Sequence, residues 1–300
     1  MPDFDVVHVF GVYDLLGPVA AFHAARCGRP YVLEPLGMAL PILRSISKKR
    51  LYHFILGKDM FRRASRVIAT SQREYEQLLD ARIVPEERLQ LRRNGVDLSE
   101  FVNAPERGSS RKALGLGPKS RIVLYLGRLA PVKSLDLLIR AFARLDLKDT
   151  KLILAGPEES DGYKKGLVKL ISDLGLGDRV IFTGPIYGEK KIGLLRDTDV
   201  LVLPSVYESF GNSAAEAIAA GTPVVVTENC GIAPMIRDRV GLVADHTDLH
   251  VADALRQLLV QPELHKAFAD KCPEIARELT WDEPVTQMET LYHALDNGQN

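Results

Sequence analysis

The chain has 300 residues, of which 46% are hydrophobic and 26% are charged, enough for about two globular domains. This composition excludes disordered, collagen-like and coiled-coil chains. The 39 basic and 39 acidic side chains cancel to a formal net charge of zero. Because a dedicated nucleic-acid binder normally carries a basic excess, we expect no nucleic-acid partner.

The cysteines and the N-terminus bear on the cellular compartment. Cys27, Cys230 and Cys272 are too far apart, and odd in number, for a disulfide framework or a metal-ligand spacing. The N-terminus has acids where a signal peptide has basic residues, and no stretch reaches the roughly 18 apolar residues of a spanning helix. We therefore expect a cytoplasmic protein that does not cross the inner membrane but is able to touch its inner face.

Short β-branched runs alternate with helical periodicity along the whole chain, which is typical of strand–helix units around buried parallel sheets. The first four predicted strands are Val6–Phe10, Tyr31–Glu34, Val67–Ala69 and Leu89–Arg92. The other six are Ile122–Leu126, Leu152–Ala155, Val180–Phe182, Val200–Leu203, Val224–Val226 and Gly241–Val243. The sequence thus predicts the α/β class with two sheets.

A stretch rich in Pro, Gly and Ser, residues 102–120, separates the two series of strands and is typical of a linker. We expect an N-terminal Rossmann-like domain over residues 1–103 and a larger one over residues 104–275. We expect residues 276–300 to form a helix that packs back towards the N-terminal domain. Only the second series has the six strands of a complete doubly wound sheet.

Residues 40–66 carry eight basic side chains and one acidic one, a net charge of plus seven. Apolar side chains such as Phe54 and Phe61 are interleaved with them, so the segment is suited to lie on an anionic membrane surface. A helix pair with an apolar face towards the core and a basic face towards solvent explains the pattern slightly better.

The most informative segment spans residues 201–226, where a strand, a loop and a small-residue helix follow one another. Glu208 lies in the loop, and Asn212 or Ser213 can cap the helix. The backbone N–H groups at such a helix start form an anion site. The start also lies at the carboxyl edge of the sheet, where open α/β folds bind ligands.

Glu216 belongs to the same helix, among Ala, Ile and Gly residues that should pack tightly. An ordinary strand–helix–strand unit with two exposed glutamates is the alternative interpretation. However, a lone carboxylate in such a face is costly unless it binds a polar ligand. The segment therefore favours a binding site.

A second segment, LYLGRLAPVKS, runs from a strand into Gly127, where a glycine lets the backbone approach a ligand. Arg128 and Lys133 follow within a few residues, and two cations at the end of a domain's first strand suit a diphosphate. A basic pair near a helix start is often only a solvent-exposed feature without a ligand. The prediction of a diphosphate site here therefore depends also on the two glutamates of the same domain.

Four segments together resemble the fourth family of retaining, nucleotide-sugar-dependent glycosyltransferases, the glycosyl transferases group 1. They are GRLAPVK, the glutamates at 208 and 216 with seven residues between them, RNGVD at 93–97 and YVLEPLGM at 31–38. The resemblance extends from Asp5 to about Tyr292. It implies a GT-B-like fold, in which two Rossmann-like domains face a cleft.

The resemblance also implies residue roles. Arg128 and Lys133 would grip the donor diphosphate during catalysis, Glu208 would bind a hydroxyl of the donor sugar, and Glu216 would accept hydrogen bonds from the ribose. The other implied donor-binding residues are Gly127, Pro185, Ile186, Tyr187, Phe210, Gly211, Asn212 and Ser213. In this scheme residues 210–213 hold phosphate through backbone N–H groups, and residues 184–187 meet the base.

Fixed positive charge beside the phosphates is what such a transfer needs most, because a leaving dianion forms as the glycosidic bond breaks. Arg, Lys and a helix N-terminus provide that charge without a metal. We find no Asp-x-Asp pair placed to hold a divalent ion against a pyrophosphate. We therefore expect no metal and no cofactor beyond the UDP, GDP or ADP-type donor, which is a substrate. The implied mechanism is same-face attack with the leaving phosphate as base, so Glu208 is a binder.

The chain departs from the family pattern at its N-terminus. Members normally have about three more strands and a glycine-rich loop before the equivalent of residues 5–10, and Gly11 does not replace that loop. The N-terminal domain therefore looks truncated. We expect another chain, either a second copy or a separately made N-terminal polypeptide, to cover the sheet edge at residues 5–10.

A second departure is Leu36, where the family often has a histidine. His8 and His23 are nearby candidates for a role in acceptor binding. Packing within a strand or helix explains each of them at least as well.

The sequence therefore predicts a hexosyltransferase that uses a nucleotide-diphosphate sugar and a glycan or lipid-linked acceptor. Two alternatives stay open: a catalytically silent nucleotide-sugar-binding subunit that needs a partner chain, and a nucleotide-sugar epimerase of the same fold. The spacing of Glu208 and Glu216 favours the transferase.

Overall fold

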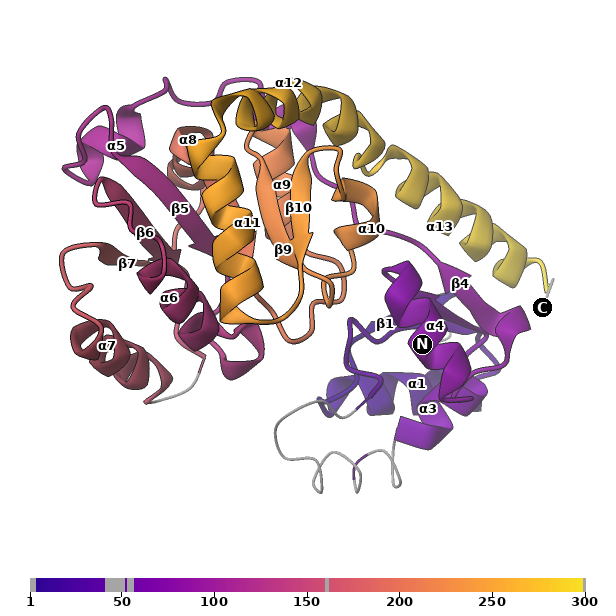
Figure 1. The fold of residues 1–300 in the computed structure, drawn as a ribbon. Coiled ribbons are helices and arrows are strands. Elements are labelled where there is room, and N and C mark those ends of the chain that lie inside the picture. Colours follow the sequence, from indigo (N-terminus) through magenta and orange to yellow (C-terminus); the bar gives the residue numbers. More distant parts are fainter. Residues whose placement is uncertain (1–3, 41–51, 53–56, 160–161, 299–300) are drawn as a thin grey trace. The chain divides into compact units, whose positions relative to one another are not determined.

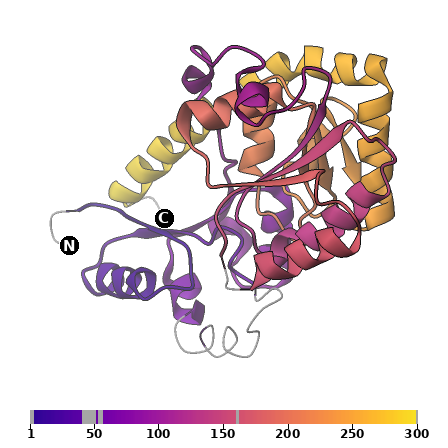
Figure 2. The ribbon, with the colours of Figure 1, turned by 90° about the vertical axis from the view of Figure 1, so that its left-hand side faces the viewer.

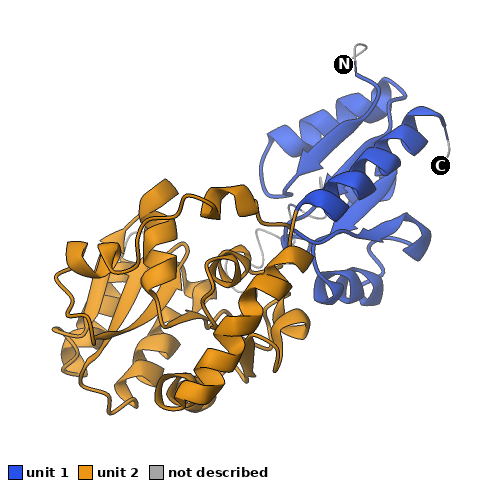
Figure 3. Cartoon of the chain, turned by 90° about the horizontal axis from the view of Figure 1, so that it is seen from above, with its two compact units in different colours: residues 1–94, 281–300 blue, residues 95–280 orange. Residues whose placement is uncertain are grey.

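A computed structural model describes residues 4–40, 52, 57–159 and 162–298 (Figure 1). The chain forms two units (Figure 3), which are described separately. Unit 1 comprises residues 1–94 and 281–300, and unit 2 comprises residues 95–280.

Unit 1 contains a parallel sheet with the strand order β1-β2-β3-β4. Its strands are β1 (Val7–Phe10), β2 (Tyr31–Glu34), β3 (Arg66–Ala69) and β4 (Leu89–Leu91). Its helices are α1 (Leu16–Arg26), α3 (Lys58–Arg63), α4 (Gln72–Asp80) and α13 (Asp282–Asp296).

The two faces of this sheet are covered by different parts of the chain. On one face, Tyr31 and Leu33 of β2 pack into a cluster that includes Phe61 of α3. On the other, Val32 packs against Leu291 of α13. Successive side chains of a strand point to opposite faces of the sheet, and both faces are buried here, so residues 31–33 of β2 are all apolar. Helix α13, from the C-terminal part of the chain, covers the second face of this sheet.

A buried carboxylate ties α4 to the loop after β2. Ser71 caps α4, because its hydroxyl accepts a hydrogen bond from the Glu74 N–H. The Glu74 carboxylate in turn accepts hydrogen bonds from the backbone of Gly37 and from Thr70. Burial raises the pKa of Glu74, and these three hydrogen bonds oppose that shift.

Unit 2 contains a parallel sheet with the order β10-β9-β8-β5-β6-β7. Its strands are β5 (Arg121–Leu126), β6 (Thr150–Ala155), β7 (Val180–Gly184), β8 (Val200–Leu203), β9 (Val224–Thr227) and β10 (Gly241–Ala244). Its helices are α5 (Ser109–Ala113), α6 (Leu135–Ala143), α7 (Tyr163–Asp173), α8 (Gly188–Asp197), α9 (Asn212–Ala219), α10 (Ala233–Ile236), α11 (Asp248–Val260) and α12 (Pro262–Glu278).

Helices cover both faces of the unit 2 sheet, with α6 and α11 on one side and α8 and α9 on the other (Figures 1 and 2). Strand order reverses between β5 and β8, which is the switch point of a doubly wound sheet. Ligands of such sheets bind beside the carboxyl ends of the strands at this point. The predicted α/β class with two parallel sheets is confirmed.

The segment 40–66 lies only partly within the described residues. In α3, Phe61 and Met60 are buried in the unit 1 core, so Phe61 is not available to a lipid surface. This part of the segment matches the core-facing alternative. Residues 41–51 and 53–56, which hold four of the eight predicted basic side chains, lie outside the described residues. No helix in the described ranges is both long and apolar enough to cross a membrane.

Strand β1 lies at one edge of the unit 1 sheet, and β2 is its neighbour there. Several large apolar side chains near this edge are exposed, including Phe10 at 57% and Leu16 of α1 at 79%. The others are Phe4, Leu15, Val19 and Phe22. We call these six residues the edge patch.

Candidate active site

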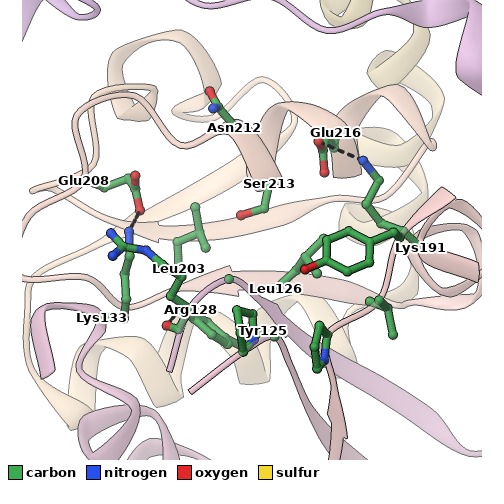
Figure 4. Close-up of a pocket in the computed structure, with 16 residues that line it drawn as sticks. Tyr125, Leu126, Arg128, Lys133, Lys191, Leu203, Glu208, Asn212, Ser213 and Glu216 are labelled. Carbon is green, nitrogen blue, oxygen red and sulfur yellow. Dashed lines mark hydrogen bonds and ion pairs between the residues drawn. The ribbon is translucent and has the colours of Figure 1, made fainter. Parts of the chain in front are cut away.

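A pocket of about 500 Å³ lies in unit 2 at the switch point of the sheet (Figure 4). It is lined from the strand ends and from the loops and helices that follow them. The lining residues are Tyr125, Leu126, Gly127, Arg128, Lys133, Gly156, Pro157, Pro185, Ile186, Tyr187, Lys191, Leu203, Glu208, Asn212, Ser213 and Glu216. Ten of the twelve residues predicted for donor binding and catalysis are therefore brought together in one pocket.

Helix α9 begins at this pocket. Its N-cap is Gly211, at φ 114° and ψ 53°, and no side chain caps the helix. The expectation that Asn212 or Ser213 would be the cap is therefore corrected, since both lie inside the first turn and line the pocket. The first N–H groups of an α-helix have no acceptor within the helix, so this turn offers donors to an anion.

Glycine is required at position 211 for a steric as well as a conformational reason. A Cβ atom there would lie 2.8 Å from Sγ of Cys230 and 3.1 Å from Cγ2 of Ile232. Phe210, the preceding residue, is buried in the core, and its carbonyl accepts a hydrogen bond from the Ile232 N–H. Phe210 and Gly211 are the two predicted donor-binding residues that do not line the pocket, and they position the start of α9 from behind.

One end of the pocket holds an ion pair between Lys133 and Glu208. Lys133 ends a short 3₁₀ helix, Pro131–Lys133, and Glu208 lies in the loop between β8 and α9. The backbone of Glu208 donates to the Asn229 carbonyl and accepts from the Gly231 N–H, so this loop is fixed at the residue itself. Both side chains are less than one-fifth exposed.

Arg128 lies beside this pair and forms an ion pair of 2.9 Å with Glu159. The Arg128 side chain is 58% exposed, so it is the more accessible of the two predicted catalytic cations. The Tyr125 hydroxyl donates to the Arg128 carbonyl at 2.7 Å. Burial raises the pKa of Tyr125 well above its usual range, and the Glu208 carboxylate raises it further, so the phenol keeps its proton and holds this loop.

The backbone packs closely behind Gly127. A Cβ atom on Gly156 would lie 1.9 Å from the Gly127 carbonyl oxygen. The loops that follow β5 and β6 can therefore approach each other only because residue 156 is a glycine, which also sits at φ 146°.

The other end of the pocket holds a second ion pair. Lys191 of α8 places its ammonium 3.1 Å from Oε1 of Glu216 and 3.9 Å from Oε2 of Glu100. Figure 4 shows the two lysine–glutamate pairs at opposite ends of the pocket, with Asn212 and Ser213 between them. Glu216 thus has a polar partner, as its apolar sequence surroundings required.

The loop between β7 and α8 supplies Pro185, Ile186 and Tyr187 to the pocket. Tyr187 precedes α8 as its N-cap residue and is 74% exposed. An exposed aromatic ring at the mouth of a pocket offers a flat apolar surface to a planar ligand.

Six lining residues are absent from the sequence prediction: Tyr125, Leu126, Gly156, Pro157, Lys191 and Leu203. Five of them lie at the ends of β5, β6 and β8 or directly after, so the rule that ligands bind at carboxyl strand ends could have indicated them. Lys191 carries no such signal, because it follows Lys190 inside a charged helix.

The Asp197-Thr198-Asp199 sequence lies before β8, at the opposite edge of the sheet from the pocket. Asp197 accepts hydrogen bonds from three backbone N–H groups at the start of α5, and Asp199 pairs with Arg111. These two carboxylates therefore stabilise the contact between α5 and the segment before β8, and they do not line the pocket. Among the described residues, no group of three or more His, Cys, Asp and Glu side chains is arranged to hold a metal ion.

Comparisons with known proteins decide the family. The family model described as glycosyl transferases group 1 matches residues 106–274, and the model described as glycosyl transferase 4-like domain matches residues 2–95. The chain belongs to the glycosyl transferases group 1 family. The earlier resemblance is therefore confirmed over both units.

Several relatives carry the name D-inositol 3-phosphate glycosyltransferase. The one from Actinosynnema mirum is 32% identical over 303 residues, which cover 96% of this chain and 72% of the relative. The one from Mycolicibacterium gilvum is 36% identical over 244 residues, which cover 78% of this chain and 54% of the relative. For several such relatives the matched region is about half of their length.

Two solved structures show the same fold. Sucrose-phosphate synthase from Thermosynechococcus elongatus has a TM-score of 0.84 at 26% identity, covering 98% of this chain and 74% of that one. The Anabaena protein HepE, solved with UDP and glucose, has a TM-score of 0.84 at 23% identity, covering 97% and 78%. The predicted GT-B-like fold is confirmed, as is the prediction of a nucleotide-sugar glycosyltransferase. The comparisons favour neither the silent subunit nor the epimerase.

Proposed function

We propose that this glycosyltransferase moves a hexose, with retention of configuration, from a nucleotide-diphosphate sugar to a glycan or lipid-linked acceptor. The observation that carries the proposal is the pocket of unit 2, where two lysine–glutamate pairs flank the start of α9. We assign donor binding to this unit and acceptor binding to unit 1. The assignment of individual residues follows from their chemistry.

The diphosphate belongs beside Arg128 and Lys133, with the first turn of α9 next to it. A guanidinium offers a planar fork of donors to phosphate oxygens, and an ammonium offers three donors. The residues Gly127, Asn212 and Ser213 let the phosphates approach the backbone closely. Glu208 shares Lys133 with the phosphate and accepts a hydrogen bond from a hydroxyl of the sugar.

The other end of the pocket suits the nucleoside. Glu216 accepts hydrogen bonds from the ribose, and Pro185, Ile186 and Tyr187 border the base. The sugar and the diphosphate thus lie at the end with Lys133 and Glu208, and the ribose and the base lie at the end with Glu216 and Tyr187.

The reaction breaks the bond between the anomeric carbon and the diphosphate oxygen, and the electron pair leaves with the phosphate. Arg128, Lys133 and the helix start stabilise the negative charge that develops there, and they do so in place before the bond breaks. The acceptor hydroxyl attacks from the same face and gives its proton to the departing phosphate. Glu208 is engaged by Lys133 and acts as a binder, not as a nucleophile.

The solved relatives support a uridine donor as the first to test. HepE structures have been solved with UDP, with UDP and glucose, and with UDP-glucose. Nucleotide-sugar binding therefore has direct precedent in proteins of this fold.

A thermal-shift panel of UDP, GDP, ADP and their sugars tests the donor, followed by an assay of donor hydrolysis. We expect one nucleotide to raise the unfolding temperature of the protein. The corresponding nucleotide sugar should be hydrolysed slowly, also in the presence of EDTA. From an α-linked donor, NMR should detect the α-anomer of the released sugar. Binding without turnover would favour the silent subunit, and no stabilisation by any nucleotide would contradict the proposal.

We further propose that the basic side chains of residues 40–66, and not the buried Met60 and Phe61, contact an anionic membrane surface, consistent with a lipid-linked acceptor. The support is the net charge of plus seven in this segment. Co-sedimentation with vesicles should increase with the fraction of anionic lipid and fall with salt. Equal binding to purely zwitterionic vesicles would argue against this contact.

We also propose that a second polypeptide chain covers the edge patch and pairs with β1. Parallel sheets are usually buried on both faces and protected at their edges. The apolar side chains of the patch on α1 and at the end of β1 are the support.

A further inference from the structure

Lys191 is a pocket residue for which the donor contacts above give no role. It lies on α8 next to Lys190, which is exposed, whereas the Lys191 side chain is only 18% exposed. Its ammonium lies 3.1 Å from Glu216 and 3.9 Å from Glu100. Two carboxylates on different elements therefore hold this cation at the nucleoside end of the pocket.

The pair formed by Lys191 and Glu216 has an unusual combination of hydrogen-bonding groups. The ammonium has three N–H donors, and the carboxylate has lone pairs beyond the one that the lysine uses. Donors and acceptors thus lie side by side. A phosphate would be repelled by the carboxylate, and an apolar group would exclude water from the remaining donors and acceptors of the pair without replacing its hydrogen bonds.

Vicinal hydroxyl groups fit such a pair, because each hydroxyl both donates and accepts a hydrogen bond. We propose that Lys191 binds the ribose diol together with Glu216, and that it makes the pocket select ribonucleotides over nucleotides that lack these hydroxyls. The inference rests on the proposed function, since it needs a nucleotide in this pocket. A site built to hydrogen-bond a hydroxyl rejects an analogue without it, because its own polar groups are left unpaired.

The test compares a ribonucleoside diphosphate with its 2′,3′-dideoxy form by calorimetry. The base is the one among UDP, GDP and ADP that binds the wild type most tightly. The variants are Lys191→Met and the matched control Lys190→Met, which removes the neighbouring exposed charge. We expect Lys191→Met to bind the ribo form about tenfold more weakly and the dideoxy form within about threefold of the wild type. Lys190→Met should match the wild type with both.

Equal weakening of both forms by Lys191→Met, or no weakening of either, would overturn the inference. Thermal unfolding without nucleotide shows whether the variant folds like the wild type. In a Glu216→Gln background, Lys191→Met should have a smaller effect on the preference, because the two residues act as a pair. Failure of the wild type to bind any of the three nucleotides would overturn the proposed function and this inference together. Binding with an unchanged preference would overturn the inference alone.

Discussion

At the scale of single residues, the charges of the pocket are neutralised in pairs. Lys133 contacts Glu208, Lys191 contacts Glu216, and Arg128 contacts Glu159 outside the pocket lining. Partly exposed pairs of this kind contribute little to folding stability. Their effect is to hold each side chain in one place, so that a donor meets charges that are already oriented.

Lys133→Ala and Glu216→Gln should each weaken nucleotide binding without unfolding the protein. The first removes a cation from the diphosphate, and the second removes the charge that strengthens hydrogen bonds to the ribose. We expect each to raise Kd by about tenfold or more, measured by calorimetry. If both variants bind as tightly as the wild type while folding normally, the site is misplaced.

At the scale of elements, the start of α9 is fixed by the packing of Gly211 against the segment after β9. Cys230 and Ile232 leave no room for a side chain at this position. The anion-binding turn is therefore not an isolated helix end. Its position depends on two loops at the carboxyl edge of the sheet.

Gly211→Ala should lower the free energy of unfolding by about 3 kcal/mol, through a strained backbone and the clash with Sγ of Cys230. The control is Gly175→Ala, where φ is 65° and a Cβ atom meets nothing within 4 Å. That change should cost about 1 kcal/mol, from conformation alone. Urea unfolding of both variants measures the difference, and equal losses would show that packing at position 211 is loose.

At the scale of the whole molecule, the two sheets differ in their number of strands. The six-stranded sheet of unit 2 is a full doubly wound sheet. The four-stranded sheet of unit 1 is closed on one face by α13, which comes from the other end of the chain, but β1 and α1 expose the edge patch. Within the described part of the chain, β2 is the one strand that pairs with β1, and an exposed apolar surface at such a sheet edge is a typical site of association.

The purified chain should therefore have a mass in solution above the 33.2 kDa of one copy, measured by light scattering after gel filtration. Replacing Phe10 and Phe22 by Asp should reduce that mass, because it places charge in the edge patch. Phe10→Leu with Phe22→Leu is the control that keeps the patch apolar. A monodisperse monomer at micromolar concentration would count against a partner on this edge.

Much of the architecture is determined by local sequence. The ten strands follow from β-branched runs because parallel strands are buried on both faces, so every position of β8, for example, is apolar. The site residues around Arg128, Lys133, Glu208 and Glu216 follow from charged residues placed directly after such strands. Sequence could indicate them because topology carries all these strand ends to one edge of the sheet.

Tertiary structure alone decided the partners of these residues. Lys190 and Lys191 look alike in sequence, and only the packing of α8 beside α9 brings the second of them to Glu216. Asn212 and Ser213 are good capping residues in general, yet Gly211 is the cap, because Cys230 and Ile232 exclude any side chain at the turn. Such choices depend on contacts between residues that are distant in sequence. The sequence by itself therefore indicated that Arg128, Lys133, Glu208 and Glu216 reach the pocket, and the fold decided that Lys191 joins them and which of these charges pair.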